Sequence, residues 1–465
     1  MRRTRIVATL GPSTDDPSVL EALLAAGVDV VRLNAAHSGT SELESRLRAV
    51  RAASEKLGRH VGVMVDLPGP KIRVGDIARG TDLVLGSVFT LCAENCVGDA
   101  NHACISYAGL AEDLKPGDRV LIDDGKVELE VSTVDPARGA VVTRVLVGGP
   151  LSSNKGVNVP GVTLGVEAMT DIDRAAIAWA CGVDIDFIGQ SFVRSAADVD
   201  NLRALMNRPI PIVAKIEKHE AVAALDAIIA AADAVMVARG DLGVETSPEQ
   251  VPVIQRHIIE AARAVGKPVV IATQMLDSMT TASRPTRAEA SDVANAIFGR
   301  ADAVMLSGET AVGDHPVLVV QTMGRISKTA EEAIRGDGGD EHGPTSDVQE
   351  AVSAAVCDLA SDLQLAAIVP VTQSGATAFA VSRHRPPRRI VAVTPTPAVA
   401  RRLSLLWGVR ALVIDFAADT DRLLDDVCDA LLESGMAPRG SRVAITAGRS
   451  TRIEGGTDFI LVREV

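Results

Sequence analysis

The sequence predicts an α/β protein: a (β/α)₈ TIM barrel with an inserted small β-barrel lid domain and a C-terminal open α/β domain. Its 465 residues are too many for one ordinary hydrophobic core, so we expect two or three domains. Apolar residues make up 47% of the chain and aromatic residues only 2%, so the cores must be packed from aliphatic side chains. Short apolar runs, each followed by a helical pattern, recur along most of the chain.

Eight of these apolar runs have the length and composition of buried parallel strands. They are rich in β-branched residues and apolar on both faces, as in a sheet that helices cover on both sides. Eight strands that alternate with helices indicate a closed barrel, and an open doubly wound sheet is the alternative. The runs are 6–12, 28–34, 61–69, 184–192, 211–217, 233–241, 268–274 and 302–309.

A long segment between the third and fourth strands changes character. Residues 76–160 contain turn signals such as PGD at 116–118 and DG at 124–125, with short alternating runs between them. This pattern predicts a small all-β domain inserted into a catalytic barrel formed by 1–75 and 161–335. An insertion at this point lies on the rim where barrel active sites are found, so we expect it to act as a mobile lid.

The last part of the chain predicts a separate domain. A polar, glycine-rich linker at 335–347 precedes alternating apolar and helical patterns, so 346–465 is expected to form an open α/β regulatory domain. One strand there is followed by hydroxyl groups and a glycine at a helix start, which can cradle a phosphate. Ordinary helix capping is the alternative. These candidate effector residues are Thr372, Ser374, Gly375 and Thr377.

The composition argues against several classes of partner. A net charge of −13 opposes a broad contact surface for nucleic acid, and the scarcity of aromatic residues opposes base stacking. The apolar stretch after the N-terminal arginines is short for a secretory signal, and no apolar run can span a bilayer. Six scattered cysteines fit reduced thiols, so we expect a cytoplasmic protein that binds neither nucleic acid nor membrane.

One group of side chains in the inserted segment has a spacing that can hold zinc. Cys92, Cys96, His102 and Cys104 offer thiolate and imidazole ligands, which suit that ion. We favour the other interpretation, in which these are free thiols in a variable region.

Polar side chains gather where the predicted barrel strands end. Each alone is explained by helix capping or by bridging of barrel layers. Their convergence from nearly every strand is harder to explain structurally, because barrel active sites are assembled in this way. The residues are Arg32, Asn34, Asp66, Lys71, Arg73, Ser191, Lys215, Glu217, Arg239, Asp241, Thr273, Gln274, Ser307 and Glu309.

The residue types at these strand ends suggest metal-assisted phosphoryl chemistry. Glu217 and Asp241 offer two hard carboxylates on neighbouring strands, which suits Mg²⁺ or Mn²⁺. Lys215 points to the same side as Glu217 and can neutralise a transferring phosphoryl group, and a structural ion pair is the alternative. Backbone N–H groups around Gly240 can bind a substrate carboxylate. Thr273 can deliver a proton, and a helix cap is its alternative role.

Several long segments resemble the pyruvate kinases, and the resemblance covers nearly the whole chain. It implies transfer of phosphate from phosphoenolpyruvate to ADP, which gives pyruvate and ATP in glycolysis, and it suggests a homotetramer. The matching segments are NKGVNVPG (154–161), VAKIEKHE (213–220), VMVARGDLGVE (235–245), ATQMLDSM (272–279), RPTRAEASDVANAI (284–297) and VMLSGETAVGDHP (304–316).

The resemblance also implies a role for each matching residue. Glu217 and Asp241 bind the divalent ion, Lys215 stabilises the transferring phosphoryl group, and Thr273 helps to protonate the enolate of pyruvate. Substrate-binding positions are Ser191, Gly240, Asp241 and Thr273, with Arg32 and Arg73 near the phosphates. Positions on the nucleotide side are Asn34, His37, Lys155 and, in the lid, Asp124.

The chain departs from the family pattern where most members bind an essential K⁺. Ala36 replaces a serine and Leu67 a threonine, so two oxygen ligands are missing, while Lys71 replaces a glutamate. The ammonium of Lys71 can supply a permanent charge near the vacated site. This combination resembles the potassium-independent branch of the family, so K⁺ is not expected to be required. A degenerate or repurposed site is the alternative interpretation.

Two other functions and one regulatory property stay open at this point. A metal-dependent aldolase acting on pyruvate or phosphoenolpyruvate shares the carboxylate pair but needs neither the lid nor the nucleotide positions. A non-catalytic metabolite sensor needs only the C-terminal domain. A phosphorylated allosteric effector is possible, but Gln373 stands where members that respond to fructose-1,6-bisphosphate often have lysine.

Overall fold

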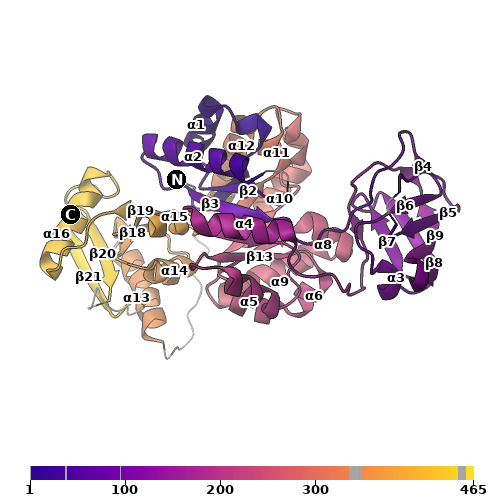
Figure 1. Ribbon diagram of the computed structural model, residues 1–465. Helices are drawn as coiled ribbons and strands as arrows, with labels where there is room; N and C mark the ends of the chain where they lie inside the picture. The colour runs from indigo at the N-terminus through magenta and orange to yellow at the C-terminus, as the bar shows by residue number, and fades with distance from the viewer. Residues whose placement is uncertain (1, 37–38, 95, 335–344, 346, 449–456) are drawn as a thin grey trace.

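Eight parallel strands close into a barrel at the centre of the molecule (Figure 1). This computed structural model describes residues 2–36, 39–94, 96–334, 345, 347–448 and 457–465. In order round the barrel the strands are β1 (Arg5–Thr9), β2 (Val30–Asn34), β3 (Gly62–Leu67), β12 (Phe187–Gln190), β13 (Ile212–Ile216), β14 (Ala234–Ala238), β15 (Val269–Ala272) and β16 (Ala303–Leu306). Because β1 pairs with both β2 and β16, the closed barrel is confirmed and the open sheet is wrong.

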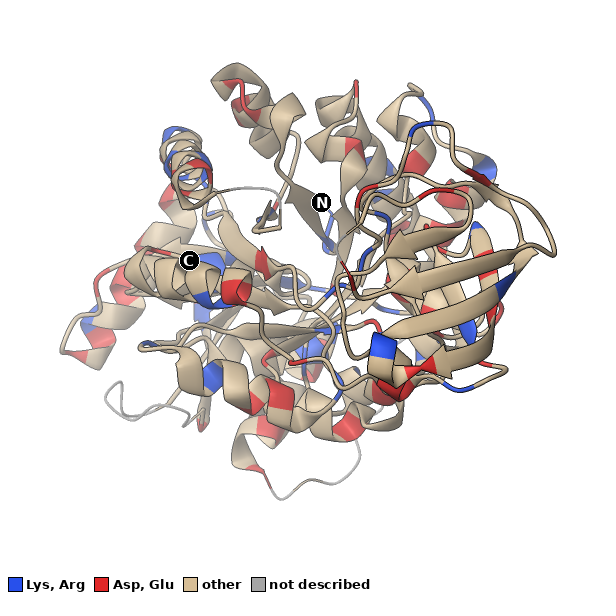
Figure 2. Cartoon of the chain, turned by 45° about the vertical axis from the view of Figure 1, so that its right-hand side comes forward, with Lys and Arg blue, Asp and Glu red and all other residues tan. Residues whose placement is uncertain are grey.

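Both faces of each barrel strand are buried, which explains why the strands are continuous apolar runs. In β1, Val7 lies in the cluster inside the barrel, whereas Ile6 and Ala8 pack against the helices. Acidic and basic residues are interspersed over the outer helices (Figure 2). The longer helices of this layer are α1 (Pro17–Ala25), α2 (Thr40–Lys56), α4 (Asp171–Gly182), α5 (Ala196–Leu205), α7 (Leu225–Ala231), α9 (Val251–Ala264), α10 (Arg287–Phe298) and α12 (Pro316–Ala333).

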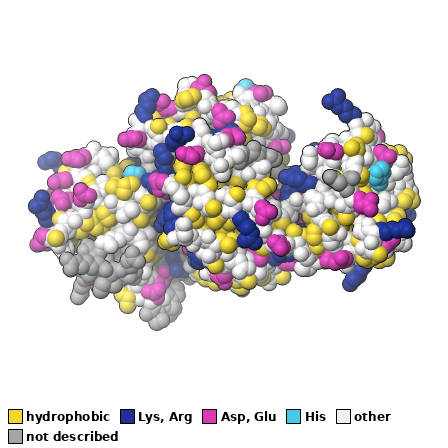
Figure 3. Space-filling view, in the orientation of Figure 1, with side chains coloured by type: hydrophobic (Ala, Val, Ile, Leu, Met, Phe, Trp, Pro, Cys, Tyr) yellow, Lys and Arg dark blue, Asp and Glu magenta, His cyan; other side chains and the backbone are white. Residues whose placement is uncertain are grey.

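The inserted segment forms the predicted β lid, which is a curled sheet that projects from the barrel as a separate lobe (Figures 1 and 3). Its own hydrophobic cluster extends from Ile72 to Leu164 and includes the fully buried Phe89. The six-stranded sheet has the order β11 (Val157–Asn158), β7 (Arg119–Ile122), β8 (Val127–Asp135), β9 (Ala140–Val147), β5 (Val88–Cys92) and β6 (His102–Cys104), and β4 (Asp82–Leu83) pairs with β10 (Gly149–Pro150).

The C-terminal part is the predicted open α/β domain. Its sheet has the order β19 (Val409–Val413), β18 (Arg389–Thr394), β17 (Ala367–Pro370), β20 (Arg442–Ala447) and β21 (Phe459–Glu464), with only β21 antiparallel. Separate hydrophobic clusters lie on the two faces of this sheet. The helices are α13 (Val348–Asp362), α14 (Ala376–Arg383), α15 (Pro397–Arg402) and α16 (Thr420–Glu433). Most of the predicted linker 335–347 lies outside the described residues.

The lid and the C-terminal domain lie at opposite ends of the barrel (Figure 1). Ser404 accepts a hydrogen bond of 3.2 Å from the backbone N–H of Gly62, the first residue of β3, and Leu405 joins the cluster inside the barrel. The lid follows the other end of β3, where the strands finish. Among the described helices, none is both long enough and apolar enough to cross a membrane.

Candidate active site

The side chain of Lys215 lies at the centre of a buried charge network at the strand ends. Lys215 is the penultimate residue of β13 and is only 8% exposed. Its Nζ donates to Ser191 Oγ at 2.6 Å and lies 2.9 Å from Glu217 Oε1 and 3.4 Å from Asp66 Oδ2. Burial alone lowers the pKa of Lys215, but the carboxylates of Asp66 and Glu217 outweigh it and raise this pKa. The lysine is therefore held as a cation.

The carboxylate of Glu217 lies in an electrostatically unfavourable place. Burial raises its pKa, Lys215 opposes the shift, and the negative charge of Asp241 adds to it. The backbone N–H of Phe192 donates to Glu217 Oε2 at 2.7 Å and holds the side chain in position. A divalent cation would relieve the repulsion between the two carboxylates, so this donor pair fits Mg²⁺ or Mn²⁺. In the described part of the chain, no group of three or more His, Cys, Asp or Glu side chains is arranged to hold a metal ion.

Asp241 lies in α8 (Arg239–Glu245), directly after β14, and meets Lys71 across the mouth of the barrel. The Nζ of Lys71 donates to Asp241 Oδ1 at 2.8 Å. Sequence reasoning expected Lys71 near the positions vacated by the potassium ligands, and this stays a prediction; the ion pair that the structure shows for Lys71 is with Asp241, a predicted metal ligand. The charge of Lys71 therefore reaches the divalent-ion side of the site.

Thr273 follows β15 in a strained backbone conformation. Its φ is 66° and that of Gln274 is 54°, a region that residues other than glycine rarely occupy. Thr273 Oγ1 accepts a hydrogen bond of 2.8 Å from the N–H of Gly240 and donates to the carbonyl oxygen of Ala272 at 2.7 Å. The hydroxyl thus contacts the first turn of α8, which follows the neighbouring strand β14. Its oxygen accepts from the Gly240 N–H, which we expected to bind substrate.

Arg32 and Asp66 pair beside Lys215. Arg32 Nε donates to Asp66 Oδ2 at 2.7 Å and its Nη1 to Thr9 Oγ1 at 3.1 Å. Burial alone raises the pKa of Asp66, but Arg32 and Lys215 outweigh it and lower this pKa, so the carboxylate stays ionised. The structure thus brings Arg32 into the network. Asn34, by contrast, uses its Oδ1 locally to accept from the N–H of Ala36 at 3.0 Å.

The residues predicted on the lid side form a second group. Arg73 Nη1 donates to the carbonyl oxygen of Asn154 at 2.9 Å, and Lys155 Nζ lies 2.9 Å from Asp123 Oδ1. Asp124 has a φ of 57° in the same turn. Among the described residues, no hydrogen bond or ion pair joins Arg73, Lys155 or Asp124 to the network around Lys215. His37 lies outside the described residues.

Sequence reasoning missed several residues that position the site. Asp292 binds Arg239 at 2.7 Å, and Arg239 Nη2 donates to the carbonyl oxygen of Thr273 at 2.7 Å, so this pair supports the strained turn. Asp123, next to the predicted Asp124, is the lid carboxylate that contacts Lys155. Both had a weaker sequence signal, because Asp123 stands in the DDG turn and Asp292 in the segment 284–297 that resembles the family.

The hydroxyl groups of the candidate effector loop hydrogen-bond within the protein. Thr372 Oγ1 accepts from the N–H of Gly375 at 2.9 Å, and Gly375 has a φ of 98°. Ser374 Oγ accepts from Ala376 at 3.5 Å, and Thr377 Oγ1 lies 2.7 Å from Thr457 Oγ1. These bonds stay within the loop or reach Thr457, and α14 itself begins at Gly375 without a side-chain cap hydrogen bond.

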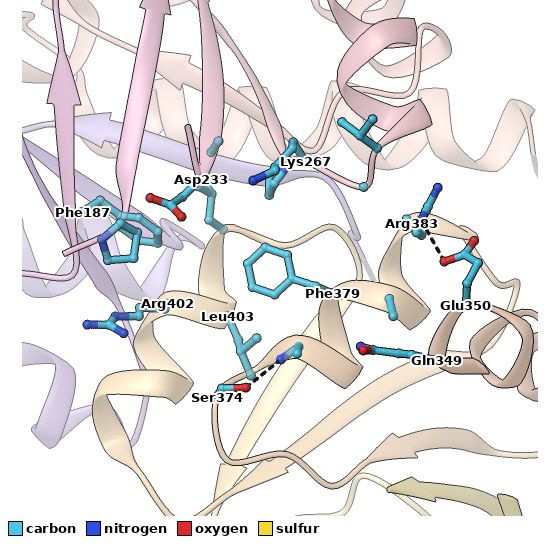
Figure 4. A pocket seen from close by; sticks show the side chains of 18 of the residues that line it. Phe187, Asp233, Lys267, Gln349, Glu350, Ser374, Phe379, Arg383, Arg402 and Leu403 are labelled. Atoms are coloured by element: carbon cyan, nitrogen blue, oxygen red, sulfur yellow. Dashed lines mark hydrogen bonds and ion pairs between the residues drawn. The ribbon is translucent and has the colours of Figure 1, made fainter. Parts of the chain in front are cut away.

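A cavity of about 450 Å³ lies beside this loop, between the barrel and the C-terminal domain (Figure 4). Asp233 and Lys267 approach it from the barrel, and Phe379 of α14 points into it. At its edge Arg383 Nη1 pairs with Glu350 Oε2 at 2.8 Å. Ser374 therefore borders a space large enough for a small metabolite.

The fold and the buried network at the strand ends define a barrel phosphotransferase. Comparison with known proteins then specifies the family. The model of the pyruvate kinase barrel domain matches residues 1–320, and that of the pyruvate kinase alpha/beta domain matches residues 350–463. The chain belongs to the pyruvate kinase family.

Individual relatives match over essentially the full chain. A pyruvate kinase of Clostridium acetobutylicum is 42% identical, with 100% of both chains covered. A pyruvate kinase of Mycobacterium tuberculosis is 42% identical over 100% of this chain and 98% of its own. Among solved structures, a pyruvate kinase of Cryptosporidium parvum superposes with a TM-score of 0.91 at 32% identity, covering 100% of this chain and 96% of that one.

Proposed function

We propose that this chain transfers the phosphoryl group of phosphoenolpyruvate to ADP and releases pyruvate and ATP. The observation that carries the proposal is the buried Lys215, which donates to Ser191 and pairs with Glu217 at the strand ends. A buried cation in this position stabilises the charge on a phosphoryl group as it is transferred. The names of the relatives support the same substrates.

We assign the divalent-ion site to Glu217 and Asp241. Bound there, Mg²⁺ or Mn²⁺ would supply a Lewis acid that neutralises charge on substrate oxygens. Lys215 holds Glu217 in place, and Lys71 and Asp241 are paired until the ion competes for that carboxylate. Arg32 and Arg73 bind phosphate oxygens, and Ser191 and Gly240 line the substrate pocket. Thr273 delivers a proton to the enolate, directly or through water.

We propose further that the enzyme works without K⁺. Ala36 and Leu67 have no side-chain oxygen to offer such an ion, and Lys71 carries a permanent charge close to Asp241. A tethered ammonium replaces a dissolved cation without a binding equilibrium.

The remaining assignments follow the family. Residues 1–75 and 161–335 form the catalytic barrel, 76–160 the lid and 346–465 the regulatory domain. Asn34, His37, Lys155 and Asp124 bind the nucleotide as the lid closes. We expect a cytoplasmic homotetramer, in which a phosphorylated effector binds at Thr372, Ser374, Gly375 and Thr377 beside the cavity of Figure 4.

The proposal is tested by supplying phosphoenolpyruvate, ADP and Mg²⁺ and measuring both products. Formation of ATP and pyruvate in equal amounts is expected. Pyruvate chemistry without ATP formation would indicate an aldolase-like barrel enzyme. Binding of metabolites to the C-terminal domain with no turnover would indicate a sensor.

A further inference from the structure

Three thiols of the lid come together where β5 ends beside β6. Cys92 and Cys104 stand opposite each other in the register of these strands. Cys92 Sγ lies 3.7 Å from Cys96 Sγ, and Cys104 Sγ donates to the carbonyl oxygen of Cys96 at 3.1 Å. His102, which the zinc interpretation needs, has its Nδ1 3.0 Å from Asp99 Oδ1. Within the residues that the structure describes, these thiols are not joined in disulfides, and no group of three or more His, Cys, Asp or Glu side chains is arranged to hold a metal ion.

This cluster is hydrogen-bonded to the segment that carries Arg73, which lies between β3 and β4. The carbonyl oxygen of Cys104 accepts from the N–H of Gly75 at 2.8 Å. A Cβ at Gly75 would lie 2.2 Å from Cys104 Sγ, so the thiol packs directly against the backbone of Gly75, where no side chain fits. The N–H of Ser106 donates to the carbonyl oxygen of Arg73 at 2.9 Å, and Ser106 Oγ accepts from the N–H of Arg73 at 2.9 Å. The backbone on either side of Cys104 is thus hydrogen-bonded to the connection between barrel and lid.

We propose that Cys92 and Cys96 form a reversible dithiol switch. A small-molecule disulfide oxidises the two thiols to a disulfide, and formation of this disulfide displaces the segment that carries Arg73. The two sulfur atoms are half-buried and must approach from 3.7 Å to about 2.05 Å. Where closing this gap also shifts the backbone of Cys96, the shift reaches β6, because the Cys96 carbonyl oxygen accepts from the thiol of Cys104 at 3.1 Å.

The reaction is an ordinary thiol–disulfide exchange. The thiolate of Cys92 attacks one sulfur of the small-molecule disulfide, whose S–S bond breaks and releases one thiol. The thiolate of Cys96 then attacks Cys92 Sγ and releases the second thiol. Two protons are lost, and two electrons pass from the protein to the reagent. Burial, and then hydrogen bonds with Cys92 and Cys104, raise the pKa of Cys96 to about 12.

The experiment treats the full-length protein with glutathione disulfide and follows linkage and kinetics together. Peptide mapping should find a Cys92–Cys96 disulfide, with the mass lower by two hydrogen atoms. The kcat/KM for phosphoenolpyruvate should fall at least about threefold. This loss is smaller than the roughly hundredfold loss that a 1 Å misplacement of a catalytic group can cause. Dithiothreitol should restore the original value.

Matched variants separate this switch from general thiol damage. In Cys92→Ser and Cys96→Ser, the ratio of kcat/KM before and after oxidation should stay near one. Cys181→Ser, which removes a half-buried thiol of α4 instead, should respond as the parent does. Absence of the linkage, an unchanged kcat/KM after it forms, or an equal loss in the serine variants would overturn the proposal. The kinetic part rests on the proposed role of Arg73, whereas the mapping result does not.

Discussion

The rim of the barrel and the effector loop of the C-terminal domain both place polar side chains after a buried strand, but they differ in what those side chains contact. At the rim, Lys215, Asp66 and Glu217 are buried charges that contact one another. In the loop, Thr372 and Ser374 accept hydrogen bonds from nearby backbone N–H groups. Burying charges costs several kcal/mol per ion unless they are paired, whereas a hydroxyl that accepts from a nearby backbone N–H stabilises its own loop. The comparison indicates that chemistry belongs at the rim and that the loop is first of all structural.

Replacing the buried lysine tests this contrast most severely. In Lys215→Met we expect kcat/KM to fall by about 10²–10³ or more, because the transferring phosphoryl group loses its fixed cation. Asp66 and Glu217 also lose their partner, so the free energy of unfolding should decrease by about 3–5 kcal/mol. Steady-state kinetics and urea unfolding measure the two effects. Lys56→Met, at an exposed ion pair on α2, is the matched control, and near-normal turnover of Lys215→Met would remove the residue from its role.

The hydroxyl of Thr273 is expected to have the next largest effect. Thr273→Val keeps the shape of the side chain but cannot donate a proton, so exchange of the pyruvate methyl protons with D₂O should slow by about 10²-fold. Thr273→Ser retains the hydroxyl and should keep most of the rate. If both variants slow equally, the hydroxyl is not what the reaction needs, and Thr273 acts through the strained turn and not through proton delivery.

The carboxylate pair predicts a divalent-ion site that can be measured without turnover. In Glu217→Gln the affinity for Mn²⁺, followed by electron paramagnetic resonance, should fall at least about tenfold. Asp233→Asn, at the opposite end of the barrel, removes a carboxylate that pairs with Arg203 and should leave Mn²⁺ binding unchanged. An equal loss in both variants would exclude this site.

The pH dependence of Mn²⁺ binding follows from the raised pKa of Glu217, whose main cause is burial. A metal ligand must be ionised, so binding should be complete above this raised pKa and be lost as the pH falls through it. The loss should therefore begin above the ordinary glutamate range. Glu217→Gln should remove this transition, and a parent midpoint at or below the ordinary value would contradict the assigned environment.

The effector loop should give the smallest effects. Thr372→Val removes the hydroxyl that accepts from Gly375, so the free energy of unfolding should decrease by about 1 kcal/mol while kcat stays unchanged. Calorimetric titration of the parent with AMP and sugar phosphates decides whether the loop also binds a metabolite. Absence of heat with every ligand would leave the local hydrogen bonds of this loop as its only role.

The sequence predicted the strands well because buried parallel strands are continuous apolar runs with polar residues at one end. This pattern located Lys215, Glu217 and Asp241 before any contact between them was known. The contact between Lys71 and Asp241 and the support of Thr273 by Arg239 and Asp292 were not predictable, since they depend on how the lid connection and α10 lie over the barrel mouth.

For the candidate effector loop, by contrast, the sequence did not predict which contacts the side chains make. The hydroxyl and glycine pattern at Thr372 and Gly375 is the same for a phosphate cradle and for a helix cap, because both use backbone N–H groups at a helix start. The three lid thiols were visible as a spacing, but only the pairing of β5 with β6 brings Cys92 opposite Cys104. In both places, residue types alone cannot tell which partners the side chains meet.

The proposed use of Lys71 in place of a dissolved ion is tested by a coupled assay for pyruvate formation, run with Mg²⁺ in buffer free of potassium and sodium. With the ammonium of Lys71 2.8 Å from Asp241, turnover should change by less than about twofold when K⁺ is added. A rate that is negligible without K⁺ and restored by it would contradict the assignment of this charge to Lys71.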